Sequence, residues 1–80
     1  MDYKVLFGAA VKIYRKEAGL SQEELAALSK LDRTYISGIE RGVRNPTLLT
    51  IYRLATALEI GPEAFFTTIS NLAEIEEDRH

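Results

Sequence analysis

The chain has 80 residues, of which 46% are hydrophobic and 28% charged, and it contains neither cysteine nor tryptophan. A chain of this length forms one domain, residues 1–80, and buries about 60–65% of its unfolded surface, so its own stability is modest. Disulfides and thiolate metal sites are excluded, and the only histidine is the terminal His80, so we expect no metal, no cofactor and no catalytic residue. No apolar run approaches membrane-spanning length and no signal-peptide pattern opens the chain, which predicts a cytoplasmic protein.

The net charge of −2 is unevenly distributed along the chain. Residues 1–58 carry nine Lys or Arg against six acids, a net +3, whereas residues 59–80 carry one Arg against six acids, a net −5. A basic region favours a polyanionic partner, although three net positive charges are also common on solvated helix faces.

Helical periodicity runs through the first half of the chain. The first helix is expected to begin near Tyr3 and to end before Gly19, because glycine suits the left-handed position after a helix. Ser21 and Glu24 have the spacing of a capping box and open the second helix, and Asp32 is a suitable N-cap for the third.

Glycine and proline divide the second half. Gly42 closes the third helix, and a loop follows because the residue before Pro46 avoids the helical conformation. Thr47 caps the fourth helix, and Gly61 with Pro62 separates it from the fifth. The expected helices span about residues 3–18, 22–28, 33–41, 48–58 and 62–75, with a frayed acidic tail over 76–80. Because no strand pattern appears, we predict an all-α fold.

A short turn joins the second and third helices, as in a helix-turn-helix, although such pairs are also ordinary packing units. At about 100° per residue, one sector of the third helix collects Arg33, Thr34, Ser37 and Arg41. The aliphatic side chains of Ile36 and Ile39 lie opposite. Arginine can bond guanine O6 and N7, threonine can contact the thymine methyl, and a second arginine can neutralise a phosphate. This face suits the major groove of DNA, although every amphipathic helix has a polar face.

Gly38 interrupts the same helix with a residue that is a poor helix former. It costs about 0.5–1 kcal/mol relative to alanine. Its small size would let the backbone or a neighbouring side chain come close to DNA.

The segment from Ser21 to Gly42, followed by Arg44-Asn-Pro-Thr47, resembles the Cro/repressor-type (XRE-like) helix-turn-helix family. The segment from Leu31 to Arg41, the short chain and the Phe65-Phe66 helix are similar to restriction–modification controller proteins. The resemblance covers about residues 5–66. It implies a five-helix, repressor-like DNA-binding domain in which the second and third helices form the helix-turn-helix.

The resemblance also implies roles for side chains near the third helix. Gln22 grips a backbone phosphate, and Arg33 and Thr34 read bases in the major groove. Tyr35 and Ser37 lie at the DNA surface. From the residues alone, Gln22 can instead be a solvated residue at a helix start, and the ring of Tyr35 points toward the apolar side of its helix.

The loop after the third helix belongs to the same expected site. The resemblance implies that Arg44 and Asn45 reach the DNA backbone there, although Asn45 is also a common turn residue before Pro46. The expected DNA-binding residues are therefore Gln22, Arg33, Thr34, Tyr35, Ser37, Arg41, Arg44 and Asn45.

Two positions bear on the framework of the helix-turn-helix. Arg15 and Glu40 match a family pair that joins the first and third helices, so the resemblance implies a structural salt bridge there and no contact with DNA. Lys30 stands where the family turn usually has glycine. Either the turn is strained or it is built differently.

The fifth helix carries more apolar surface than a four-helix core can easily cover. One of its two phenylalanines is expected to complete the core, and the rest to form a symmetric dimer interface. The expected interface residues are Phe65, Phe66, Ile69, Leu72 and Ala73. A dimer also suits DNA reading, because one helix reads only about four base pairs whereas a dimer reads two half-sites.

These observations predict a sequence-specific transcriptional regulator that binds a palindromic DNA operator as a homodimer, without a small-molecule effector. The controller resemblance implies control of its own promoter and that of an endonuclease gene, with contact to RNA polymerase. Glu23 and Glu24, beside the DNA-facing residues, are candidates for that contact, although Glu24 is equally explained by its capping role. The alternative is an antitoxin or other protein-interaction module in which DNA binding is secondary. An enzyme is not expected, since no paired carboxylates, phosphate-binding loop or nucleophile–base motif is present.

Overall fold

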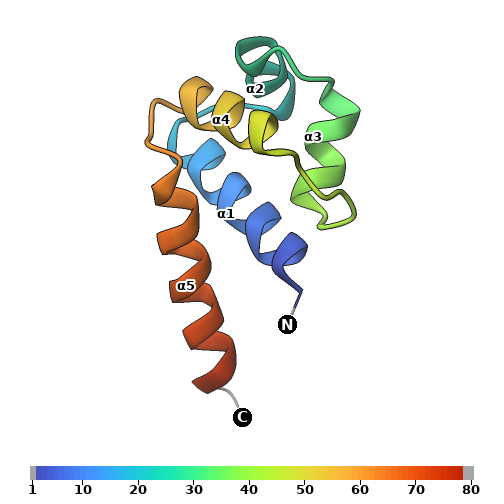
Figure 1. The fold of residues 1–80 in the computed structure, drawn as a ribbon. Coiled ribbons are helices and arrows are strands. Elements are labelled where there is room, and N and C mark those ends of the chain that lie inside the picture. The colour runs from blue at the N-terminus through green and yellow to red at the C-terminus, as the bar shows by residue number, and fades with distance from the viewer. Residues whose placement is uncertain (1, 79–80) are drawn as a thin grey trace.

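Five helices form the structure, a computed structural model that describes residues 2–78 (Figure 1). They are α1 (Tyr3–Glu17), α2 (Gln22–Ser29), α3 (Arg33–Glu40), α4 (Leu48–Ala57) and α5 (Glu63–Asp78). The described residues contain no strand, so the predicted all-α fold is confirmed. Within the same residues, no helix combines the length and the apolar character needed to cross a bilayer.

Short polar side chains start the helices at the predicted positions. Ser21 accepts a hydrogen bond from the Glu24 amide at 3.0 Å, and the Glu24 carboxylate accepts one from the Ser21 amide at 2.9 Å, so the capping box is present. Asp32 and Thr47 each accept a bond from a backbone amide of their own helix at 3.1 Å. Asp2 caps α1 in the same way, which was not predicted. These bonds satisfy amides that have no partner inside a helix.

Two helix boundaries differ from the prediction. After α4 the chain turns at Glu59, which has a left-handed φ of 57°, rather than at Gly61. α5 continues to Asp78, so the expected fraying of the acidic tail is wrong for residues 76–78, while residues 79–80 lie outside the described part. The tail contains glutamates, which are good helix formers, and no glycine or proline, so the helix can continue.

The turn between α2 and α3 has left-handed geometry at Lys30, with φ 60° and ψ 33°. For a residue with a side chain this conformation costs about 1–2 kcal/mol. The amides of Lys30 and Leu31 both donate to the Ala26 carbonyl and close the turn. Of the two possibilities left by the sequence, the strained turn is therefore the one that occurs.

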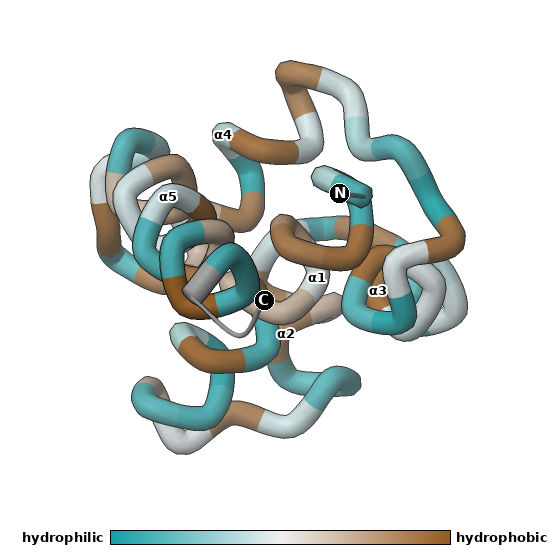
Figure 2. The backbone as a smooth tube through the Cα atoms, turned by 90° about the horizontal axis from the view of Figure 1, so that it is seen from below, coloured by the Kyte–Doolittle hydropathy of each residue, from teal (hydrophilic) through white to brown (hydrophobic). Residues whose placement is uncertain are grey.

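The core forms around α1, which lies between α3 and α5 (Figure 2), while α2 packs against α3 and α4. The largest fully buried side chains are Val11, Leu25, Ile36, Ile39, Leu54 and Phe65. The rings of Phe7 and Tyr14 meet Phe65 edge-on, with centroid separations of 5.1 and 5.8 Å. The Tyr14 hydroxyl also lies 2.9 Å from the Thr68 hydroxyl. These contacts attach α5 to α1.

A buried ion pair attaches α3 to α1, as the family resemblance implied. Arg15 Nε lies 2.6 Å from Glu40 Oε2, and Arg15 Nη2 donates to Glu40 Oε1 at 3.0 Å. The two side chains are only 10% and 4% exposed. Arg15 Nη1 also donates to the Leu20 carbonyl at 2.9 Å, and the hydrogen bond to Glu40 raises the pKa of Arg15 further above its usual value. The pair therefore ties the C-terminal end of α3 to α1.

Glu40→Gln should lower the melting temperature more than any other single acid-to-amide change. It would leave Arg15 buried without a carboxylate partner, which costs about 3–5 kcal/mol. Thermal unfolding followed by circular dichroism measures the loss, with Glu17→Gln as a matched control at an exposed acid of α1. Equal melting temperatures for the two variants would contradict the structural role of the pair.

Candidate nucleic-acid interface

The polar face predicted for the third helix is turned toward solvent in α3. Ile36 and Ile39 are 0% and 1% exposed and face the core. Arg33 and Thr34 are exposed, and Ser37 is half-buried at the edge of that face. The opposite burial of the two faces follows from the helical repeat, since residues three and four apart share a side. α3 therefore presents a short, cationic and hydroxyl-bearing surface.

Arg33 stands at the start of this surface beside the first turn of α2. Its Nε lies 3.8 Å from Oε1 of Glu23, and the two side chains are 59% and 79% exposed. An ion pair this exposed contributes about 0–1 kcal/mol to stability, so it does little to restrain the guanidinium. Arg33 can leave Glu23 for an acceptor such as a guanine edge at small cost.

Gln22 is tied to the ion pair beneath the surface. It is half-buried, and its Nε2 donates to Glu40 Oε1 at 3.1 Å. A primary amide has two N–H donors, so one remains for a second acceptor such as a phosphate oxygen. The alternative of a freely solvated Gln22 is therefore wrong, because its amide is held by Glu40.

Tyr35 lies on the boundary between the two faces of α3. Its side chain is half-buried and packs against the core, so its ring is on the apolar side as the helical angles indicated. A tyrosine in this position combines a buried ring with a polar tip. Its hydroxyl can meet DNA only at the edge of the surface.

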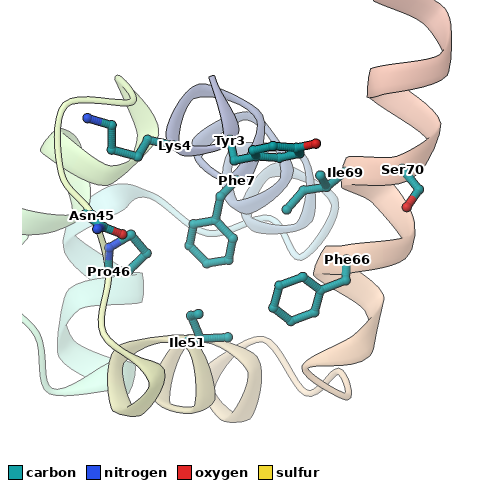
Figure 3. A pocket seen from close by; sticks show the side chains of 9 residues that line it. All are labelled: Tyr3, Lys4, Phe7, Asn45, Pro46, Ile51, Phe66, Ile69 and Ser70. Carbon is teal, nitrogen blue, oxygen red and sulfur yellow. The ribbon is translucent and has the colours of Figure 1, made fainter. Parts of the chain in front are cut away.

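The three other expected contacts lie at and beyond the end of α3. Arg41 is the C-cap of α3, and Arg41, Arg44 and Asn45 are all exposed. Asn45, together with Pro46, also lines a hollow whose lining includes no residue of α3 (Figure 3). Asn45 thus borders two surfaces, whereas Arg41 and Arg44 belong to the loop that follows α3.

Of the two uses expected for the space at Gly38, the structure shows a neighbouring side chain filling it rather than an open backbone. Its Cα is covered by the Arg44 side chain, because a Cβ on residue 38 would lie 2.7 Å from Arg44 Cγ. The space that glycine leaves on α3 is therefore occupied by this chain's own arginine rather than left open for DNA. The contact was missed because nothing in the sequence indicates that the loop returns to this point.

Glu23 and Glu24 differ in how their carboxylates are used. The amide and hydroxyl of Ser21 hold the pKa of Glu24 below its usual value, because both hydrogen bonds favour its ionised form. Glu24 is thus engaged in capping α2. Only Glu23 offers a largely unrestrained carboxylate next to Arg33.

The apolar residues of α5 are divided between core and surface. Phe65 is 0% exposed, so its assignment to a dimer interface is wrong; it fills the core between Phe7 and Tyr14. Phe66, the next residue along the helix, is 50% exposed. The other residues expected in the interface are half-buried: Ile69, Leu72 and Ala73.

Phe66 borders an open hollow of about 360 Å³ between α1, α4 and α5. Its ring points toward the hollow, across from Phe7 and Ile51, with Ile69 beside it (Figure 3). This part of the surface is apolar and lies apart from the polar face of α3. The apolar surface around this hollow is thus distinct from the cationic surface of α3.

Comparisons with known proteins agree with this geometry. A family model described as helix-turn-helix matches residues 11–65. Control protein C.BamHI from Bacillus amyloliquefaciens is 45% identical over 73 residues, and the match covers 88% of this chain and 90% of that protein. The crystal structure of the restriction-modification controller protein C.AhdI from Aeromonas hydrophila superposes with a TM-score of 0.79 at 49% identity, covering 81% of this chain and 98% of that chain.

A second solved relative is similar over much of the chain. The restriction-modification controller protein C.Esp1396I, in a structure of its tetramer in complex with its natural 35 base-pair operator, superposes with a TM-score of 0.78 at 40% identity. The match covers 85% of this chain and 90% of that chain. The chain therefore belongs to the helix-turn-helix family of transcriptional regulators, in its XRE-like branch, and several of its relatives there are restriction–modification controller proteins.

Proposed function

We propose that this regulator binds a palindromic operator in the cytoplasm and controls its own promoter and that of an endonuclease gene in a restriction–modification system. The observation that carries this proposal is the outward polar face of α3, with Arg33 and Thr34 exposed on a helix whose other face is buried. The controller relatives, one of them solved on its operator, support the same conclusion. Catalysis forms no part of the proposal.

The proposed contacts with DNA are of two kinds: contacts that read bases and contacts with the phosphate backbone that position the protein. Arg33 donates two hydrogen bonds to O6 and N7 of a guanine, Thr34 contacts a base beside it, and Ser37 lies at the DNA surface next to them. Gln22 donates to one phosphate, held in direction by Glu40. Gln22, Arg33 and Thr34 belong to the first turns of α2 and α3, which lie together at the Glu23–Arg33 pair, and Ser37 lies one turn further along α3.

A second group of contacts lies past the end of α3. Arg41 and Arg44 neutralise phosphates there, with Asn45 and the hydroxyl of Tyr35 at the margins of the contact. Such contacts fix the register of the protein on the duplex but carry no sequence information. Specificity therefore depends on Arg33 and Thr34.

Arg33→Ala should weaken operator binding by about 1–3 kcal/mol and relax discrimination at one base pair in each half-site. A gel shift with the region upstream of the protein's own gene, repeated with single-base variants, measures both effects. The matched control is Arg53→Ala, which removes an exposed arginine from α4. If the two variants bind alike, base reading by Arg33 is refuted.

We further propose a homodimer whose interface includes Phe66, Ile69, Leu72 and Ala73 on α5. The exposed ring of Phe66 beside an apolar hollow supports it, since burying such a ring removes a large apolar area from water. The tetrameric assembly of the relative on its operator supports self-association as well. A dimer also places two copies of α3 on the operator, so that both half-sites are read, whereas a single α3 reads only one.

Phe65 and Phe66 give a matched pair of tests for this interface. Phe66→Ala should raise the dimer dissociation constant in sedimentation equilibrium while leaving the monomer folded. Phe65→Ala should instead cost about 3–5 kcal/mol of folding stability, because it leaves a cavity in the core. A Phe66→Ala protein that dimerises as tightly as the parent would rule out this interface.

RNA polymerase is the further partner that we propose, with Glu23 as a contact because its carboxylate is exposed beside the DNA-facing surface while Glu24 is engaged in capping. Glu23→Gln should abolish promoter activation in a reporter assay and leave operator binding intact. Glu17→Gln, at an exposed acid of α1, is the control. Unchanged activation by the Glu23 variant would exclude the contact.

A further inference from the structure

Directly after α3 the chain turns back and runs over α3 itself. Gly42 has a left-handed φ of 77°, its amide donates to the Ile39 carbonyl, and the Val43 amide donates to the Gly38 carbonyl, both at 3.0 Å. This pair of bonds is the Schellman ending of a helix, which reverses the chain direction. Residue 44 is thereby returned to the level of Gly38.

At that level the aliphatic part of Arg44 lies directly against the backbone of α3. A Cβ on residue 38 would stand 2.7 Å from Arg44 Cγ, 3.4 Å from Nε and 3.6 Å from Cδ. Carbon atoms in contact are about 3.5–4.0 Å apart, so any side chain at 38 would displace this stem. Only a glycine lets Arg44 occupy its observed position.

Arg44 has no competing electrostatic partner in the part of the chain that the structure describes. The ion pairs there join Arg15 to Glu40 and Arg33 to Glu23, and neither includes Arg44. Its side chain is exposed although its stem is packed. The guanidinium is therefore held beside α3 by packing alone and remains available to an anion.

We propose that Gly38 is a positioning residue for DNA binding, because it lets Arg44 lie along α3 with its guanidinium set in advance for a backbone phosphate. The inference rests on the proposed function, in which Arg44 contacts a phosphate. Holding the side chain near its bound direction reduces the conformational entropy lost on binding. Gly38 thus acts on affinity through Arg44, without itself touching DNA.

The position of Gly38 supports this role. Glycine is among the least favourable residues inside a helix, and alanine is the most favourable. Gly38 stands three residues before Arg41, the C-cap of α3, is buried and has no left-handed φ, so backbone freedom is not needed there. What glycine supplies at this place is room for the stem of Arg44.

The test is a double-mutant cycle of Gly38→Ala and Arg44→Ala in the full chain. Binding to a mixed-sequence duplex and to a duplex selected from a random pool by the parent protein is followed by fluorescence anisotropy over a range of KCl concentrations. Gly38→Ala should weaken binding to both duplexes about three- to tenfold and reduce the slope of log K against log salt by up to about 1, as loss of one phosphate contact does. In the Arg44→Ala background, Gly38→Ala should change neither quantity.

Thermal unfolding separates this effect from damage to the fold. The Gly38→Ala melting temperature should be unchanged or higher, because the displaced atom belongs to a flexible side chain and alanine favours the helix. A lower melting temperature, unchanged DNA affinity, or an equal loss of affinity in the Arg44→Ala background would each overturn the role of Gly38. If the parent protein binds neither duplex, the proposed function itself fails; if Arg44→Ala weakens binding and Gly38→Ala does not, only this inference fails.

Discussion

The buried bonds among Arg15, Glu40 and Gln22 join three helices of the DNA-binding half at one point. Arg15 belongs to α1, Glu40 ends α3 and Gln22 begins α2, and one carboxylate accepts from both partners. Because the acidic group is only 4% exposed, water cannot replace either partner at low cost. The angle between α2 and α3 is therefore fixed from inside the protein, and the direction of the Gln22 amide at the surface follows from it.

The exposed face of α3 depends on the bonds among Arg15, Glu40 and Gln22 in two further ways. With its C-terminal end tied to α1, α3 turns Ile36 and Ile39 into the core, which leaves Arg33 and Thr34 facing out. The chain then reverses at the end of the same helix and lays Arg44 along it. The acidic end of α5 lies at the opposite end of the molecule from α2 (Figure 1), where its negative charge does not oppose the approach of DNA.

Local signals in the sequence predicted much of this structure, whereas contacts between distant segments were harder to predict. Caps such as Ser21 and Asp32 act within one turn and appear where expected. The turn at Glu59 was missed because a left-handed glutamate has no local signal. Phe65 and Phe66 are chemically identical, and only the positions of neighbouring helices decide which is buried. The same limit explains why the packing of Arg44 on α3 was not foreseen.

The most direct test of the account is to map where a duplex touches the folded protein. Backbone amide chemical shifts of the ¹⁵N-labelled chain would be followed during titration with a duplex selected from a random pool. The account predicts the largest changes at the starts of α2 and α3 and in residues 41–45, with little change at the C-terminal end of α5. Changes concentrated on α5 and the hollow beside Phe66, with α3 unaffected, would contradict it.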